Sequence, residues 1–297
     1  MAWSRRRRRM RDPEAHHGYR HEPVEIWTGA GGTRPDPVIR NSRLGEGVMA
    51  DGEAPQRSVG AGPTWDMCDA RSRRNLTTMP RSDGPPSGTE LLVQACRSQG
   101  IGDERVLDAF RRVRREEFVP PEWVGEAYRD RPVPIPHGQV TTQPSLVGQI
   151  VAALHLRGEE QVLEVGTGLG FQTAILATLA AHVFSVERFP DLAAWAERNL
   201  REAGVRNVTV TVGDGTLGSP ADAPFDAIVV SAAAPRVPAP LVDQLADRGR
   251  IAHPVGFGGN EVVTTYVKRG DRLVPQTPAI PAHFVRLVGT HGLPEDR

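Results

Sequence analysis

The segment Val162–Gly170 constrains the fold of this chain more than any other. It reads Val-Leu-Glu-Val-Gly-Thr-Gly-Leu-Gly, so a short apolar run ends in a glycine-rich turn, and a helical pattern follows over residues 171–181. Glycines between a buried strand and a helix let a ligand approach the backbone closely, in the usual crevice of an open α/β sheet. The segment therefore predicts an α/β fold with a ligand site at this turn.

Strand and helix patterns alternate after Gly158. The predicted strands are 161–166, 182–187, 208–214, 225–232 and 250–255, and the predicted helices are 171–181, 190–203 and 238–247. Such alternation predicts a doubly wound, Rossmann-like and mostly parallel sheet. Residues 261–274 predict a hairpin that turns at 269–271, and residues 283–288 predict a last strand, so the end of the sheet should be mixed.

The residues before this core predict a small helical cap. A first helical pattern covers residues 89–99, and a second helix, capped by Asp103, is expected to run to Arg115. A proline-rich extended stretch then covers 118–136. A third helix is expected to begin near Pro144, because proline suits the first turn of a helix.

The first 78 residues differ in composition from the rest. They hold only eight Leu, Ile, Val or Phe residues, too few for a hydrophobic core. We therefore expect a disordered leader at 1–78, an N-terminal helical cap with a substrate loop at 79–157, and a ligand-binding core at 158–297. Met67 and Met79 are alternative start positions, so a gene start placed too far upstream explains the leader equally well.

The run Arg5–Arg9 allows two interpretations. Clustered arginines bind phosphates, but this run has no interleaved aromatic residues, and the chain is balanced at 36 basic and 36 acidic residues. We therefore favour a solvated tail over a nucleic-acid-binding arm. The residues after the run are polar, unlike a signal peptide, and no stretch approaches the roughly 18 apolar residues of a membrane helix. We expect a cytoplasmic protein that contacts no membrane.

Metal and redox chemistry have no support in the residue pattern. The two cysteines stand far apart and outside any Cys-x-x-Cys pair, which excludes a disulfide framework and a cysteine-rich zinc site. The histidines at 182, 253 and 283 are too scattered to indicate a metal site. We expect no metal.

The spacing of the glycines limits which classes of ligand the turn can bind. A dinucleotide fingerprint would need a third glycine at position 171, which is Phe171, and a phosphate loop would need a Lys-Ser/Thr pair that is missing here. Acidic residues end the next two predicted strands. Glu187 is placed to accept hydrogen bonds from ribose hydroxyls, and Asp214 from an adenine amino group. The alternatives are a surface pair of Glu187 with Arg188 and a plain turn at Asp214.

The glycine spacing resembles the ExGxGxG signature of class I S-adenosylmethionine-dependent methyltransferases. An ordered set of further motifs resembles the protein-L-isoaspartate (D-aspartate) O-methyltransferase family over residues 88–292. The matching segments are 115–120, 127–130, 137–144, 164–174, 185–188, 213–215, 224–228, 241–250, 254–256 and 284–288.

The resemblance implies methyl transfer from S-adenosyl-L-methionine to the α-carboxylate of L-isoaspartyl residues in damaged proteins and peptides, with S-adenosyl-L-homocysteine as product. The ester then closes to a succinimide, whose hydrolysis repairs part of the damage. Because the carboxylate is already ionised at neutral pH, the reaction requires no metal and no strong base. We expect a monomer, with residues 158–297 as the methyltransferase core.

Thr142 is the candidate catalytic residue. The family's loop reads Thr-Ile-Ser-Gln/Ala-Pro, and here it is Val140-Thr141-Thr142-Gln143-Pro144, so Thr142 takes the place of the serine that orients the acceptor carboxylate. The alternative is a structural hydroxyl. The family's first threonine has become Val140, and a proline of its last strand has become Arg286. We interpret His137 as an exposed loop residue rather than a base.

The resemblance also implies which residues line the cofactor site. They are Gln139, Val140, Thr141, Thr142, Val147, Glu164, Gly166, Gly168, Gly170, Glu187, Asp214, Gly215 and Val288.

Two other functions remain open. A relative of this family could install isoaspartate in a dedicated ribosomal peptide by methylating an ordinary aspartate, and the altered loop allows this. The chain could also be a non-catalytic S-adenosylmethionine-binding module with a basic arm for nucleic acid, although the intact cofactor-site residues argue against it.

Overall fold

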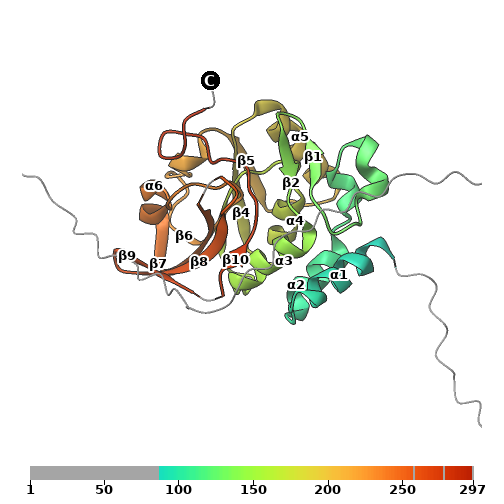
Figure 1. Ribbon diagram of the computed structural model, residues 1–297, viewed down its shortest axis with the longest axis horizontal. Coiled ribbons are helices and arrows are strands. Elements are labelled where there is room, and N and C mark those ends of the chain that lie inside the picture. Colours follow the sequence, from blue (N-terminus) through green and yellow to red (C-terminus); the bar gives the residue numbers. More distant parts are fainter. Residues whose placement is uncertain (1–86, 257, 277, 296–297) are drawn as a thin grey trace, which may run out of the picture. The chain divides into compact units, whose positions relative to one another are not determined.

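The computed structural model describes residues 87–256, 258–276 and 278–295. A mostly parallel sheet lies at the centre, with helices on both of its faces (Figure 1). The strand order is β10-β8-β7-β6-β3-β4-β5, and β9 pairs with β8. This confirms the predicted α/β fold class with a mixed end to the sheet. The expectations for the leader at 1–78 lie outside the described residues.

Five parallel strands form the body of the sheet. They are β3 (Gln161–Val165), β4 (His182–Glu187), β5 (Val208–Val212), β6 (Phe225–Val230) and β7 (Leu245–Val255). Three antiparallel strands follow, which are β8 (Val262–Arg269), β9 (Arg272–Pro275) and β10 (Ile280–Pro281). Because β3 pairs with β4 on one side and β6 on the other, the glycine turn after β3 lies at the middle of the sheet edge.

An apolar layer packs against each face of the sheet. On one face, α3 (Pro144–Ala153) and α4 (Phe171–Ala177) pack with the N-terminal helices, and α5 (Pro190–Glu202) contributes Leu200 to the same cluster. On the other face, α6 (Ala239–Gln244) contributes Leu241 to a second cluster that includes Leu163 and Ile251. Leu163 has no exposed surface, as expected for a central parallel strand.

The predicted N-terminal cap consists of α1 (Gly88–Ser98) and α2 (Glu104–Arg112). The Ser87 hydroxyl accepts a hydrogen bond from the backbone N–H of Glu90, and Asp103 caps α2 as predicted. Both helices pack against α3 at Gly148, where a Cβ atom would lie only 2.8 Å from a methyl group of Ile101. This close contact joins the cap to the start of the sheet.

The stretch predicted to be extended, 118–136, is folded into short elements. The 3₁₀ helix η1 (Arg115–Phe118) leads into it. The stretch itself contains the 3₁₀ helix η2 (Pro121–Glu126) and then β1 (Val133–Ile135), which pairs with β2 (Gln139–Thr141). The prolines in this stretch interrupt the apolar periodicity, so no helix or strand could be predicted from it. The hairpin places Thr141 and Thr142 directly before α3.

Several predicted elements differ from the structure. The helix predicted at 171–181 ends at Ala177, and the strand predicted at 250–255 begins at Leu245. The second helix ends at Arg112, because Val113 adopts an extended backbone. The helix predicted at 238–247 ends at Gln244, since β7 already begins at Leu245. Residues 283–288 form no strand, because their backbone makes only isolated bridges, one to Ala233 and one to Leu293. Among the described helices, none is long and apolar enough to cross a membrane.

Candidate active site

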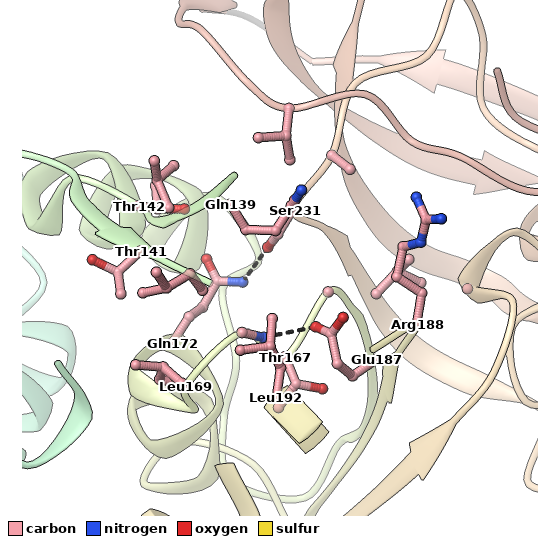
Figure 2. A pocket seen from close by; sticks show the side chains of 18 of the residues that line it. Gln139, Thr141, Thr142, Thr167, Leu169, Gln172, Glu187, Arg188, Leu192 and Ser231 are labelled. Carbon is pink, nitrogen blue, oxygen red and sulfur yellow. Dashed lines mark hydrogen bonds between the residues drawn. The ribbon is translucent and has the colours of Figure 1, made fainter. Parts of the chain in front are cut away.

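A cleft opens where the parallel strands β3, β4 and β6 end (Figure 2). The space between its walls, including the part open to solvent, amounts to about 860 Å³. Most of its walls come from residues 139–142, 165–169, 186–188, 231–232 and 285–288. This is the edge of the sheet at which the sequence places a ligand, and segments far apart in the chain meet there.

The glycine turn forms the floor of the cleft. Gly166 and Gly168 line it and have φ angles of 94° and 57°, which only glycine adopts at little cost. A Cβ atom on Gly166 would lie 3.3 Å from the Cβ atom of Ser231, so any side chain here would crowd the strand end. Gly170 does not line the cleft. It precedes α4 and packs against Leu200, 3.2 Å from where its own Cβ atom would stand.

Glu187 ends β4 at the rim of the cleft, and 5% of its surface is exposed. Its Oε2 atom accepts the backbone N–H of Gly168 at 2.9 Å (Figure 2), and its Oε1 atom accepts that of Phe189 at 3.1 Å. The carboxylate is thus held rigidly beside the turn, with lone pairs left for hydroxyl donors. In the described part of the chain, Arg188 pairs with Glu295 rather than with Glu187.

Glu164 lies behind the turn rather than in the cleft, and it has no exposed surface. It accepts hydrogen bonds from Gln172 at 3.0 Å, from Thr173 at 2.5 Å and from Ser185 at 2.7 Å. Burial raises the pKa of Glu164 to about 7, although these three donors act in the opposite direction. The carboxylate therefore positions its neighbours, and its assignment as a cofactor ligand remains a prediction.

Asp214 stands beside the cleft, where it caps a short helix, η3 (Gly215–Leu217). Its Oδ1 atom accepts the N–H and the hydroxyl of Thr216 at 2.9 and 2.6 Å, and its Oδ2 atom accepts the N–H of Thr290 at 2.7 Å. Gly215 does line the cleft, and a Cβ atom there would lie 2.4 Å from Val165. Asp214 thus fixes the C-terminal segment near the cleft, and its contact with adenine remains a prediction.

The remaining predicted residues form the opposite wall. Thr142, Val140 and Gln139 come from the β1–β2 hairpin with Thr141, and Val147 comes from α3; all line the cleft. Thr142 and Val140 also line an adjoining groove that runs along residues 278–285. None of the described residues hydrogen-bonds to the Thr142 hydroxyl, which therefore stays free to bind an acceptor at the junction of cleft and groove.

The sequence analysis missed several residues that line the cleft. Gln172, in the first turn of α4, donates to Ser231 at 2.8 Å (Figure 2) as well as to Glu164. Ser231 directly follows β6, so the strand-end rule that selected Glu187 could have found it. The others are Ile135, Val165, Thr167, Leu169, Phe171, Val186, Arg188, Leu192, Ala232 and residues 285–287. Of these, Arg286 is the residue that departs from the family's proline.

The residues present fit S-adenosylmethionine. The glycine turn admits close approach of a ligand, Glu187 offers acceptor atoms for hydroxyl groups, and Leu169 and Leu192 supply an apolar surface. The Oε1 atom of Gln172 is buried and has no partner among the described residues, so a donor on the bound group can satisfy it. Among the described residues, no group of three or more His, Cys, Asp or Glu side chains is arranged for a metal ion.

Comparison with known proteins gives consistent similarities. The sequence profile described as Protein-L-isoaspartate(D-aspartate) O-methyltransferase matches residues 87–292. The protein-L-isoaspartate O-methyltransferase of Methanoculleus marisnigri is 48% identical over 203 residues, which cover 68% of this chain and 92% of that relative. The enzyme of the same name from Aeropyrum pernix is 45% identical over 210 residues, which cover 69% of this chain and 81% of that relative.

Solved structures are similar as well. One protein-L-isoaspartate O-methyltransferase has a TM-score of 0.63 at 26% identity, and the match covers 69% of this chain and 67% of the other. A Plasmodium falciparum protein, solved in complex with S-adenosyl-L-homocysteine, has a TM-score of 0.58 at 22% identity, covering 68% and 98%. The second likeness bears on the fold alone.

Proposed function

The chain belongs to the protein-L-isoaspartate (D-aspartate) O-methyltransferase family, and on this premise we propose how its own residues carry the family's reaction. The enzyme is an S-adenosylmethionine-dependent protein carboxyl O-methyltransferase that acts on isoaspartyl residues of damaged proteins. Its methyl donor is S-adenosyl-L-methionine, and its product is S-adenosyl-L-homocysteine. The observation that carries the proposal is the free hydroxyl of Thr142 at the junction between the cleft and the adjoining groove.

The cofactor would be held by residues of the glycine turn and the neighbouring strand ends. S-adenosylmethionine supplies a methyl group that its sulfonium already activates. Gly166 and Gly168 let the bound group approach the backbone, Glu187 accepts from its hydroxyl groups, and Gln172 offers its unpaired Oε1 atom to a donor. Glu164, Gly170 and Asp214 belong to the proposed site because they position the residues that line the cleft, without lining it themselves.

The acceptor side has a simpler chemical task. An isoaspartyl carboxylate is ionised at neutral pH, so the enzyme needs to orient one oxygen rather than remove a proton. The Thr142 hydroxyl donates to that carboxylate and fixes its direction. The neighbouring groove along residues 278–285 then takes the chain on either side of the acceptor residue.

The direct test compares two forms of one short peptide, isoaspartyl and aspartyl, with labelled S-adenosylmethionine. We expect base-labile methylation of the isoaspartyl form alone. Methylation of the aspartyl form would instead support an enzyme that installs isoaspartate. Methylation of neither peptide by a protein that still binds S-adenosylhomocysteine would contradict the repair function.

Variants at Thr142 test the residue itself. Thr142→Ser keeps the hydroxyl and should retain kcat, whereas Thr142→Val keeps the shape and should lower kcat about tenfold or more. Calorimetric titration with S-adenosylhomocysteine is the matched control, and we expect both variants to bind it as the wild type does. A fully active Thr142→Val enzyme would remove this residue from the reaction.

We further propose a monomeric, cytoplasmic enzyme that contacts no nucleic acid. The composition supports this, because its charges balance and no long apolar segment is present. The proposed division into a cap with the substrate loop at 79–157 and a methyltransferase core at 158–297 is supported by the position of α3, which leads from the acceptor loop into the sheet.

A further inference from the structure

Arg115 is a charged side chain with no exposed surface, and it lies on the side of Thr141 and Thr142 away from solvent. Burying a guanidinium is costly unless every donor finds an acceptor. No carboxylate among the described residues hydrogen-bonds to it. Its Nη atoms donate to backbone carbonyls and one hydroxyl, whereas its Nε atom has no partner among the described residues. Directional bonds from the Nη atoms therefore fix its position, and the nearby Asp130 carboxylate favours its charge without a hydrogen bond.

One side of the guanidinium binds the segment between η2 and β1. The Nη1 atom donates to the carbonyls of Ala127 and Arg129, both at 3.0 Å, and the Nη2 atom donates to the carbonyl of Arg131 at 3.0 Å. Three carbonyls within five residues thus converge on one side chain. This anchors Arg115 firmly against residues 127–131.

The other side of the guanidinium binds the residues that face the acceptor. The Nη2 atom donates to the hydroxyl of Thr141 at 2.9 Å and to the backbone carbonyl of Thr142 at 3.3 Å. The guanidinium also lies 5.5 Å from the centre of the Phe171 ring, at the start of α4. Arg115 therefore connects the anchor segment, the acceptor loop and the helix that follows the glycine turn.

Asp130 fixes the residue that follows Thr142. Its Oδ2 atom accepts from the Gln143 amide at 2.9 Å and from the Ser145 hydroxyl at 2.7 Å, while its Oδ1 atom accepts the N–H of Ser145 at 2.8 Å. The carboxylate thereby caps the N-terminus of α3 from another part of the chain. The hydrogen bonds of Arg115 and Asp130 thus fix the backbone before and after Thr142, and the Thr142 hydroxyl has no partner among the described residues.

We infer that Arg115 is a positioning residue for methyl transfer, which holds the backbone of Thr142 so that its hydroxyl faces the acceptor carboxylate. This rests on the proposed function. Arg115 touches neither substrate nor cofactor and acts through Thr141 and Thr142. Burial lowers the pKa of Arg115 to about 10, and the nearby Asp130 carboxylate opposes this effect, so the side chain stays charged at neutral pH.

Lysine cannot replace this arginine. A guanidinium presents its donors in a rigid planar fork, whereas an ammonium has three donors at a single point. Arg115→Lys therefore keeps the charge but cannot reach the anchor carbonyls and the acceptor loop together. We expect kcat for the isoaspartyl peptide to fall about tenfold to a hundredfold, because small misplacements of a reacting group have effects of this size.

The experiment uses the full chain with Arg115→Lys and, as a matched control, Arg111→Lys, which changes an arginine on the outer surface of the cap. Three quantities are measured: kcat for the isoaspartyl peptide, the Kd for S-adenosylhomocysteine, and hydrogen exchange of the peptide covering residues 139–146. We expect Arg115→Lys to lower kcat and speed exchange there while leaving the Kd unchanged. The control should match the wild type in all three.

Thr141→Val provides a second variant in case Arg115→Lys fails to fold. It removes the hydroxyl that accepts from Nη2, so kcat should fall and exchange over 139–146 should rise. Added to Arg115→Lys, it should lower kcat no further, because both changes break the same bond. Wild-type kcat and exchange in either single variant, or equal losses of kcat and S-adenosylhomocysteine affinity, would overturn the inference.

Failure of the proposed function would look different. In that case the wild-type enzyme would not methylate the isoaspartyl peptide at all. Hydrogen exchange over 139–146 needs no substrate, so it would still decide whether Arg115 orders the acceptor loop.

Discussion

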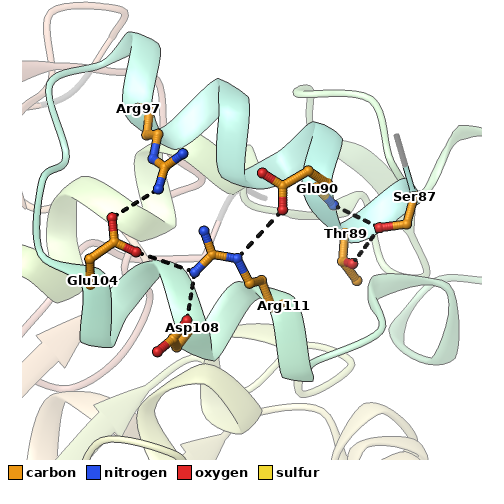
Figure 3. Close-up of polar contacts among 7 residues, drawn as sticks. All are labelled: Ser87, Thr89, Glu90, Arg97, Glu104, Asp108 and Arg111. Carbon is orange, nitrogen blue, oxygen red and sulfur yellow. Dashed lines mark hydrogen bonds and ion pairs between the residues drawn. The ribbon is translucent and has the colours of Figure 1, made fainter. Parts of the chain in front are cut away.

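Arg111 and Arg115 are four residues apart, yet they bind opposite kinds of partner. Arg111 lies on the outer face of α2, where it meets the carboxylates of Glu90, Glu104 and Asp108 at 3.5, 3.3 and 2.5 Å (Figure 3). Glu104 also pairs with Arg97, which links α1 to α2 (Figure 3). Arg115 is buried, and all of its hydrogen bonds go to uncharged acceptors.

Arg111 forms exposed ion pairs, whereas Arg115 is a buried charge that is hydrogen-bonded to neutral groups. The carboxylates around Arg111 are between one third and two thirds exposed, so water and salt compete for them and several arrangements are nearly equal in energy. Carbonyls and hydroxyls around a buried charge accept in fixed directions, and no water replaces them. Glu164 follows the second pattern, since its partners are also neutral donors. Arg115 and Glu164 adjoin residues that line the cleft, whereas the ion pairs of Arg111 lie on helices α1 and α2.

The largest expected contrast is between Arg115→Met and Arg111→Met. Arg115→Met leaves buried carbonyls without donors and should lower the free energy of unfolding by about 3–5 kcal/mol. Arg111→Met should leave stability close to that of the wild type, because its partners return to water. Urea unfolding measures both. Equal losses in the two variants would break the comparison.

A smaller contrast compares two helix caps. Asp130→Ala removes the cap of α3, and Asp103→Ala removes the cap of α2. Each should lower the free energy of unfolding by about 1–2 kcal/mol. Only Asp130→Ala should also lower kcat, because only that cap adjoins Thr142. Equal activity in the two variants would mean that the cap of α3 does not affect the acceptor loop.

The buried carboxylate of Glu164 predicts a pH effect. Its pKa is about 7 in the folded chain and about 4.5 when exposed, so the folded chain binds the proton more tightly. The resulting stability is complete below about pH 4.5 and is lost as the pH rises through 7.

Glu164→Gln removes this titration. The Tm of the wild type relative to that of the variant should therefore fall between pH 5 and pH 8. The corresponding loss in the free energy of unfolding is about 2–3 kcal/mol. Scanning calorimetry at several pH values measures it. A Tm difference that stays constant with pH would show that Glu164 does not titrate in this range.

The smallest effect is expected at Glu104 on the cap. Glu104→Gln breaks ion pairs with Arg97 and Arg111, but these are exposed and screened at physiological salt. We expect an unchanged Tm in 0.15 M salt and a small decrease only at low ionic strength. A large decrease at both salt concentrations would mean that the exposed network is as important as the buried one.

The sequence predicted the sheet and its ligand edge because both depend on local patterns. Apolar runs that end in a glycine or an acidic residue selected Gly166 and Glu187, and both residues line the cleft. Local patterns alone could not show that Glu187 lines the cleft while Glu164 lies buried behind the glycine turn. Strand ends fix the edge of the sheet but not the direction of each side chain.

The contacts of Arg115 could not be predicted in this way. The apolar periodicity predicts that Arg115 ends a helix, whereas its five acceptors lie 12 to 27 positions further along the chain. Bonds from a side chain to distant carbonyls leave no periodic pattern in a sequence. Residues 283–288 are a related case. Their sequence resembles a strand, but their backbone makes only isolated bridges and residues 285–288 line the cleft.

The strand order also determines when the enzyme becomes competent during synthesis. β3 pairs with β4 and then with β6, and the cleft takes further walls from Ser231 and residues 285–288. A growing chain emerges from the ribosome with its N-terminal part first, so the glycine turn appears long before the segments that enclose it. Contacts so distant in sequence form late in folding. A nascent chain therefore cannot form the whole cleft until residues 285–288 have been synthesised.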